Sequence, residues 1–355
     1  MHSATTSYLA LYGGTLVVHV VFMNYVLGGT AFLAAASVLR FWRRSEMAPD
    51  PIVEKARDWM PFALGAAITA GVAPLLFLQI LYDKPFYTAN LLLLHRWMSI
   101  VPVLILAFYL LYVLKSKPFE RRWMPLVAVG SFLCIAWTGL AWTENHELSL
   151  EKENWPAFYE SRSMWFREPR VWIRFSIWLS GSLPIFAMLI AWQLYARGRH
   201  GEPFVPRSRQ RLERMARAGL LISLATAAVY ASRLDAVTRG AIESPLGWTA
   251  MLGAAIGMLG QGAGWSRIRA DDTRSGGWMC VVTGAALVTA VATSVLREMI
   301  RVAALEPLAV TQHGHAAGVG GFWVFVFALL LNAALIAWCV RIGLRATRGA
   351  DRPPV

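Results

Sequence analysis

The sequence predicts an all-α, polytopic membrane protein with nine transmembrane helices, because of its composition and the placement of its basic residues. The chain is 57% hydrophobic and only 15% charged, and its apolar runs reach about 20 residues or more, which is typical of helices that span a bilayer. Nine such runs occur, at roughly 8–39, 59–82, 88–114, 123–142, 171–195, 214–233, 246–265, 277–297 and 319–340.

Lysine and arginine alternate between two sets of connections. One set holds 23 of the 34 basic residues, and it consists of 40–58, 115–122, 196–217, 266–277 and the tail from Arg341. The other connections, together with the N-terminus, hold nine. Because basic segments stay on the cytoplasmic side during insertion, we expect the N-terminus outside and the C-terminus inside.

The same distribution bears on partners and domains. A net charge of +13 would suggest nucleic acid for a soluble protein, but here most of it lies on the predicted cytoplasmic rim, where it meets anionic lipid headgroups. We therefore expect the lipid bilayer, and no nucleic acid, as a partner.

The basic stretch Ala196–Arg217 separates five helices from four and is too short for a folded linker. One membrane domain, 1–355, with lobes 1–200 and 201–355, is expected.

Polar residues within apolar runs are candidate functional residues, since each is costly in the bilayer. His19 lies eleven residues after Tyr8, or about 16 Å along a helix. An imidazole at that depth can ligate a haem iron or hydrogen-bond a neighbouring helix. The pair His95-Arg96 could be a haem ligand with a propionate partner, a quinone-binding histidine, or a pair that snorkels to the interface.

Arginines also occur at the predicted outer helix ends, where basic residues are normally few. They predict anionic partners, such as haem propionates or an acidic loop, and they are Arg174, Arg233, Arg297 and Arg301. Glu298 lies three residues before Arg301 and shares a helix face with it, so the two could instead form only a surface ion pair. Glu144, His146 and Glu147 follow the fourth run on the same side.

The longest outer connection, 143–170, is acidic and rich in aromatic residues. Aromatic rings favour the membrane interface, so we expect this segment to lie across the outer face. It could also dock a soluble partner. The sequence contains no Cys-x-x-Cys-His, which excludes covalent c-type haem on this chain.

Several of these residues resemble subunit I of the cytochrome bd-type quinol oxidases, which has nine helices, an outer N-terminus and an inner C-terminus. His19, followed by Phe22 and Leu27-Gly28, is similar to the family's haem-ligating histidine segment. Glu298-Met-Ile-Arg301 is similar to the family's Glu-x-x-Arg, whose glutamate ligates a high-spin haem b. Shorter similarities occur at Thr69–Pro74, Glu168-Pro169, Trp192 and Gly198-Arg199.

The chain also departs from that family. The family's helix 5 histidine, which ligates the low-spin haem, would fall at Ile173 or Arg174, and the paired glutamates of its third helix would fall near Pro102 and Tyr109. The long quinol-binding loop is reduced to about Leu234–Pro245. The resemblance therefore implies a divergent relative that keeps the scaffold and one or two outer haem b sites but does not reduce oxygen.

Two classes of function follow. The first is a redox subunit of a respiratory complex in the bacterial inner membrane, with other membrane subunits. It would bind quinol and haem b through residues such as His19 and Glu298, both of them haem-iron ligand candidates, and exchange electrons with a periplasmic c-type cytochrome docked at 143–170. The alternatives are a haem-free quinone-binding anchor, suggested by the Gly28-Gly29 step, and a non-redox transporter or structural subunit.

Overall fold

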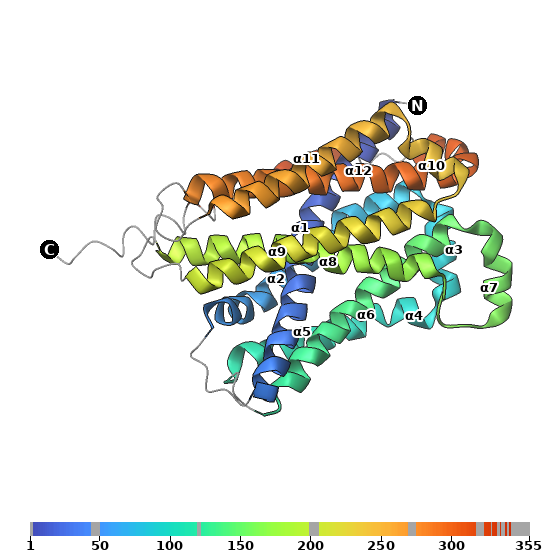
Figure 1. Ribbon diagram of the computed structural model, residues 1–355. Coiled ribbons are helices and arrows are strands. Elements are labelled where there is room, and N and C mark those ends of the chain that lie inside the picture. Colours follow the sequence, from blue (N-terminus) through green and yellow to red (C-terminus); the bar gives the residue numbers. More distant parts are fainter. Residues whose placement is uncertain are drawn as a thin grey trace.

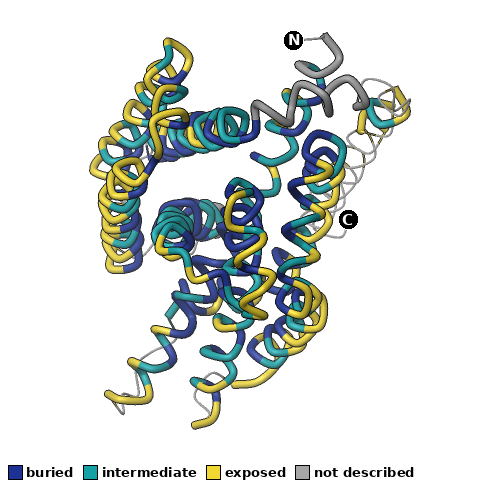
Figure 2. Tube along the Cα trace, turned by 90° about the vertical axis from the view of Figure 1, so that its right-hand side faces the viewer, coloured by how far each residue is buried: buried dark blue, intermediate teal, exposed yellow. Residues whose placement is uncertain are grey.

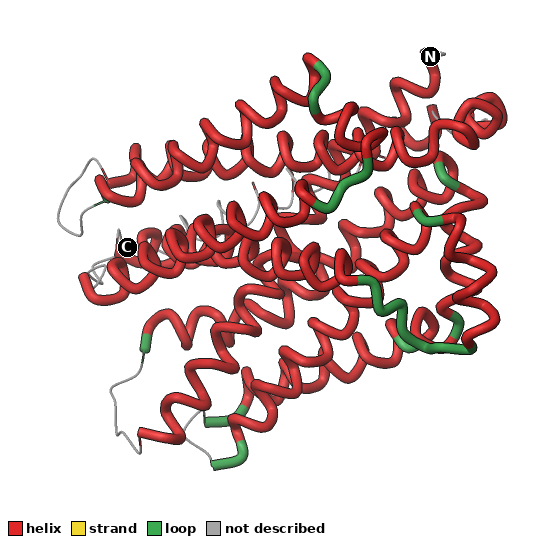
Figure 3. The backbone as a smooth tube through the Cα atoms, turned by 45° about the vertical axis from the view of Figure 1, so that its right-hand side comes forward, coloured by secondary structure: helices red, strands yellow, loops and turns green. Residues whose placement is uncertain are grey.

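The computed structural model describes residues 3–43, 50–118, 122–198, 206–268 and 275–316, together with 323–327 and a few single positions up to 341. Within these ranges nearly every residue is helical and no strand occurs (Figure 3). The all-α prediction is confirmed.

The long helices run back and forth between two ends of a bundle (Figure 1). They are α1 (Ser3–Arg43), α2 (Pro51–Leu81), α5 (Ile100–Ser116), α6 (Met124–Leu150), α8 (Pro169–Gly198), α9 (Pro206–Ser232), α11 (Pro245–Arg267) and α12 (Ser275–Ala316). Short elements gather at one end, which we call the polar end. They are α3 (Asp83–Leu93), α4 (His95–Met98), the 3-10 helix η1 (Lys152–Asn154), α7 (Trp155–Ser161) and α10 (Ala236–Ile242). The opposite end, where α1, α5, α8 and α11 finish, is the basic end.

Seven described segments are long and apolar enough to cross a membrane, so the chain is a multi-pass membrane protein. These segments are Ser7–Arg43, Pro51–Leu81, His95–Ser116, Met124–Leu150, Pro169–Tyr195, Pro206–Ser232 and Ser275–Leu305. They correspond to seven of the nine predicted runs. The seventh run is helical as α11, but its many glycines and Gln261 make it less apolar than the others. The ninth run falls largely outside the described residues.

The third predicted run, 88–114, is not one continuous helix. It breaks at Leu94, which has a positive φ of 32° and separates α3 from α4. A leucine rarely adopts this conformation, because its side chain crowds the backbone there. The break lets Arg96 turn into the protein, where it is fully buried. The position of Arg96 thus depends on a tertiary contact, which sequence periodicity does not reveal.

The prediction that an outer loop begins at Thr143 is wrong. Helix α6 continues to Leu150, and its residues from Thr143 to Ser149 are all buried. Only η1, α7 and the connection up to Glu168 leave the long helices. Polar residues end a hydrophobic run in sequence, but here they extend the helix. Four of them bond to side chains on neighbouring helices, namely Glu144, Asn145, His146 and Glu147.

Helix α1 lies at the centre of the bundle and packs against α2, α6, α8 and α12. Viewed at the polar end, buried positions gather toward the interior and exposed ones follow the periphery (Figure 2). Close approach of α1 and α8 depends on Gly28, because a Cβ there would lie 2.8 Å from the Ser182 carbonyl oxygen. The Gly28-Gly29 step is thus explained by helix packing, as small residues at a membrane helix interface usually are. Gly257 has the same role between α11 and α12.

The alternation of the helices predicts the sidedness of the connections. A reporter inserted after Ser163 should lie on the opposite side of the membrane from one inserted in 199–205, since α8 crosses between them. A reporter fused after Val355 should match the one in 199–205 if nine helices cross. The charge distribution of the sequence predicts that the reporter in 199–205 will be cytoplasmic. Measured accessibility on the same side for the first two insertions would refute the α8 crossing.

Candidate functional site at the polar end

Buried polar and charged side chains from five long helices and the α2–α3 junction meet at the polar end. We call this set the polar cluster, and it consists of Tyr12, Tyr82, His146, Glu147, Arg174, Tyr230, Arg297, Glu298 and Arg301. Ions buried in a low-dielectric bundle are costly unless they are paired and hydrogen-bonded. The contacts within the cluster show how this requirement is met.

Arg301 is the centre of one half of the polar cluster. Its Nη1 lies 2.9 Å from the Tyr12 hydroxyl and 3.3 Å from Glu298 Oε2, and its Nη2 lies 2.7 Å from His146 Nδ1. Arginine has only donors, so His146 Nδ1 must accept, and its Nε2 carries the proton. That Nε2 is buried and has no hydrogen-bond partner within the described protein.

The two oxygens of Glu298 are both engaged. Arg301 donates to Oε2, and the Tyr82 hydroxyl donates to Oε1. Burial, followed by the negative charge of Glu298, raises the pKa of Tyr82 well above its ordinary value. Tyr82 is therefore a neutral donor at physiological pH. These two contacts fix the position of the Glu298 carboxylate and leave a second lone pair on each of its oxygens.

Arg174 organises the other half of the polar cluster. Its Nη1 lies 3.2 Å from Glu147 Oε1 and 3.0 Å from the Tyr230 hydroxyl. Tyr230 in turn donates to the same Glu147 oxygen at 3.0 Å. Glu147 is fully buried, and its Oε2 has no hydrogen-bond partner in the described residues. A carboxylate held in this way has one oxygen ready to accept a proton.

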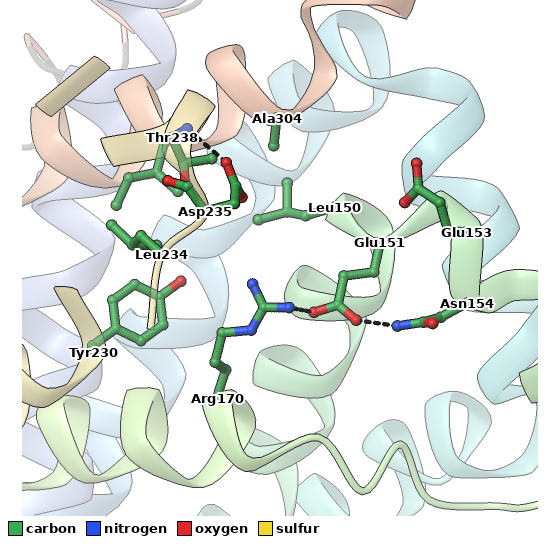
Figure 4. Close-up of a pocket in the computed structure, with 11 residues that line it drawn as sticks. Leu150, Glu151, Glu153, Asn154, Arg170, Tyr230, Leu234, Asp235, Thr238 and Ala304 are labelled. Carbon is green, nitrogen blue, oxygen red and sulfur yellow. Dashed lines mark hydrogen bonds and ion pairs between the residues drawn. The ribbon is translucent and has the colours of Figure 1, made fainter. Parts of the chain in front are cut away.

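A cavity of about 330 Å³ adjoins this half at the polar end (Figure 4). Its polar rim includes the ion pair between Arg170 and Glu151, and Asp235, which accepts from the Thr238 backbone N–H at 2.9 Å. Its apolar lining residues are Leu150, Leu234, Ile300 and Ala304. Tyr230 is the lining residue that links the cavity to Glu147. The cavity thus combines apolar walls with a hydroxyl bonded to a buried carboxylate.

Arg96 and Glu144 form a separate buried pair on the same end of the bundle. Arg96 Nε donates to Glu144 Oε2 at 2.8 Å, and both side chains are essentially inaccessible. The guanidinium also stacks over the ring of Trp137 at 3.8 Å and that of Trp165 at 4.5 Å. Because Trp165 lies between α7 and α8, this contact holds the connecting segment against the bundle. We infer a structural role for Arg96.

His19 lies on α1, seven residues and about 10 Å further along the axis than Tyr12 on the same helix face. Its Nδ1 is 2.9 Å from the Ala67 carbonyl oxygen of α2, which can only accept, so Nδ1 carries the proton and Nε2 keeps its lone pair. The ring edge with Cε1 and Nδ1 packs on Gly71, where a Cβ would lie 2.9 Å from Cε1. Metal-ligating histidines are commonly oriented by such a second hydrogen bond.

The structure brings together three of the residues that the sequence predicts as a site, namely Arg174, Glu298 and Arg301. Arg96 pairs with Glu144 instead, and His19 lies deeper on α1. His95 and Arg233 are exposed and contact neither half of the polar cluster through any described hydrogen bond or ion pair. Sequence reasoning missed the importance of His146 and Glu147. The signal available was the dense polar run 143–147 directly after an apolar helix.

Comparison with known proteins does not add an identity. No protein-family model matches the chain, and a search of curated proteins finds no match. Among the residues that the structure describes, no group of three or more His, Cys, Asp or Glu side chains could hold a metal ion. A function must therefore be argued from the geometry of the polar end and from His19.

The Arg96–Glu144 pair should matter strongly for stability. Arg96→Leu leaves a buried carboxylate without its partner and should destabilise the protein by about 3–5 kcal/mol, whereas removing both charges in Arg96→Leu/Glu144→Leu should recover much of that loss. Thermal unfolding of the purified protein in detergent measures the effect. Arg233→Leu is the control, since Arg233 is exposed at the same end. Equal effects at both arginines would contradict the buried-pair interpretation.

Proposed function

We propose that this chain is a membrane-embedded redox subunit that oxidises a quinol, or reduces the corresponding quinone, in the cavity at the polar end and holds a b-type haem through His19. The proposal rests on one contact. Tyr230, which lines the cavity, donates a hydrogen bond to the buried carboxylate of Glu147. Quinol oxidation to quinone releases two electrons and two protons. A site for it needs an apolar slot for the ring and a group that accepts a proton from the hydroxyl.

The cavity supplies both features. Leu150, Leu234 and Ile300 provide apolar contacts for a ring, and Tyr230 and Asp235 provide oxygen atoms for its hydroxyl groups. Tyr230 can relay a proton to Glu147, because its hydroxyl already donates to that carboxylate. Arg174 pairs with Glu147 and holds its carboxylate beside Tyr230. Proton release on the side of the polar end then needs no carboxylate in the interior of the bilayer.

His19 fits a haem b ligand by the chemistry of its donor atoms. The Ala67 carbonyl fixes the tautomer so that Nε2 is free to coordinate, and His19 is only partly buried on α1. Tyr12, two turns from His19 on α1, accepts a hydrogen bond from Arg301 of α12, a cationic side chain that suits an anionic propionate. A haem b bound there would supply one-electron transfer. Glu298 would be the ligand candidate for a second haem, since each of its hydrogen-bonded oxygens keeps a lone pair.

We place the polar end on the outer side of a bacterial inner membrane, following the charge distribution. Electrons would then leave toward the outer face, where η1, α7 and the segment up to Glu168 form the exposed surface. Tyr159 and Glu160 on α7 are exposed there, together with Glu153 on η1. A c-type cytochrome is the partner proposed for this aromatic surface, on which exposed Arg162 and Arg167 balance the charge of Glu153 and Glu160. Other membrane subunits would complete the complex.

A haem-free quinone-binding anchor is the second candidate. It is favoured by the hydrogen bond between His19 and the Ala67 carbonyl, which gives this histidine a helix-packing role without any haem. In that case the cavity and Tyr230 would act as described, and electrons would pass to a cofactor on a partner subunit.

The haem proposal predicts a spectroscopic difference between two histidine variants. His19→Ala should abolish the b-type haem band in a reduced-minus-oxidised spectrum, because the axial ligand is lost. His95→Ala should leave it unchanged, since His95 is exposed on α4. A wild-type protein purified without haem would exclude the haem and leave the haem-free candidate. Retention of the band in His19→Ala would exclude His19 as the ligand.

The quinol proposal predicts a kinetic difference between two tyrosine variants. Tyr230→Phe removes the hydroxyl that bonds to Glu147 and should slow quinol oxidation with an artificial electron acceptor by about 100-fold, in the range expected for loss of a proton-transfer group. Tyr159→Phe, on the exposed face of α7, should oxidise quinol at the wild-type rate. Oxygen should not serve as acceptor for the isolated chain. A wild-type rate in Tyr230→Phe would rule out the relay to Glu147.

A further inference from the structure

A second, much smaller cavity lies inside the polar cluster. Its volume is about 30 Å³, and its lining residues include His146, Arg174, Arg297 and Arg301, with Trp142 and Leu78 as apolar walls. A single water needs about 10–15 Å³, so this space accommodates a small ion or one to two waters. It is too small for a quinol ring. Its walls come from α2, α6, α8 and α12, and no residue of α1 lines it.

The hydrogen-bond pattern around this cavity calls for an acceptor. His146 Nε2 carries a proton because Nδ1 accepts from Arg301. His146 is only 5% exposed, and its Nε2 has no partner within the described protein. A buried donor without an acceptor costs about 1–3 kcal/mol. Three arginines line the cavity as donors. Thr143 and Asn145 also line it and carry acceptor oxygens, but neither is bonded to His146 Nε2, so a bound species is left to supply the missing acceptor.

The charges around the cavity indicate that this acceptor is an anion. Arg301 pairs with Glu298, and Arg174 pairs with Glu147. Arg297 donates to the neutral Tyr12 hydroxyl at 2.7 Å and forms no ion pair with any described carboxylate. Three arginines therefore face two glutamates, and one positive charge is left in a part of the bundle where an uncompensated charge is expensive.

We propose that this cavity binds one small monovalent anion, with chloride the physiological species, held by the His146 Nε2–H and by Arg297. The anion neutralises the remaining charge and satisfies the buried donor in the same step. It lies between the two halves of the polar cluster and fixes Arg297 and His146 relative to Arg174. This site is distinct from the quinol cavity and from His19, and it does not rest on the proposed redox function.

The test uses the purified full-length protein and sodium chloride or sodium bromide as the probe. At constant ionic strength, with gluconate replacing the halide, the thermal unfolding temperature of the wild type should rise with halide concentration and saturate, as binding to the folded state requires. Arg297→Gln should weaken the apparent halide affinity by about tenfold or more. Arg233→Gln removes an exposed arginine from the same end and should keep the wild-type halide response.

Two outcomes would overturn the proposal. An unfolding temperature of the wild type that does not respond to halide would show that water occupies the cavity. An identical halide response in Arg297→Gln and wild type would place the binding elsewhere. If Arg297→Gln does not fold, bromide-soaked crystals of the wild type decide by anomalous scattering. A peak beside His146 Nε2 supports the site, and its absence refutes it.

Discussion

The structure of the polar end depends on one constraint, namely that arginines buried in a low-dielectric bundle need carboxylates as partners. Three arginines lie against three glutamates there, Arg96 with Glu144, Arg174 with Glu147 and Arg301 with Glu298. Two of the three carboxylates, and His146 between them, come from the last two turns of α6. If α6 ended where its apolar run ends, two cations on other helices would be buried without partners, at a cost of several kcal/mol each.

The same requirement explains the irregular backbone nearby. Arg96 reaches Glu144 only because the chain breaks at Leu94, and the strained conformation of that leucine is offset by the ion pair and by stacking on Trp137 and Trp165. Trp165 belongs to the connection before α8, so one buried arginine holds together α4, α6 and that connection. Irregular backbone is tolerated in membrane proteins where it is buried in protein, and here it lies against α6.

Charge and hydropathy patterns therefore predicted the helices better than the site. They located the runs that become α1, α2, α6, α8, α9 and α12, because lipid-facing residues dominate each window. They failed at Thr143–Ser149 and at Leu94, where polar side chains are satisfied by distant partners that no local pattern shows. For the same reason Arg174, Glu298 and Arg301 were predicted as functional residues, whereas Tyr12 and Tyr230, which connect them, were not. The roles of these two hydroxyls become visible only in the folded structure, where five helices bring their partners together.

The groups proposed to exchange protons and the proposed haem ligand lie at different depths in the bundle. In the proposed function the proton-exchanging groups are Tyr230 and Glu147, which lie at the polar end where Tyr230 lines a cavity that reaches the surface. His19 lies about 10 Å deeper along α1, with its one hydrogen bond made to a backbone carbonyl of α2. Electrons can travel such a distance through protein, but protons need a continuous chain of groups. A redox subunit built in this way exchanges protons only with the side of the polar end, which is consistent with the absence of carboxylates from the described residues of α5.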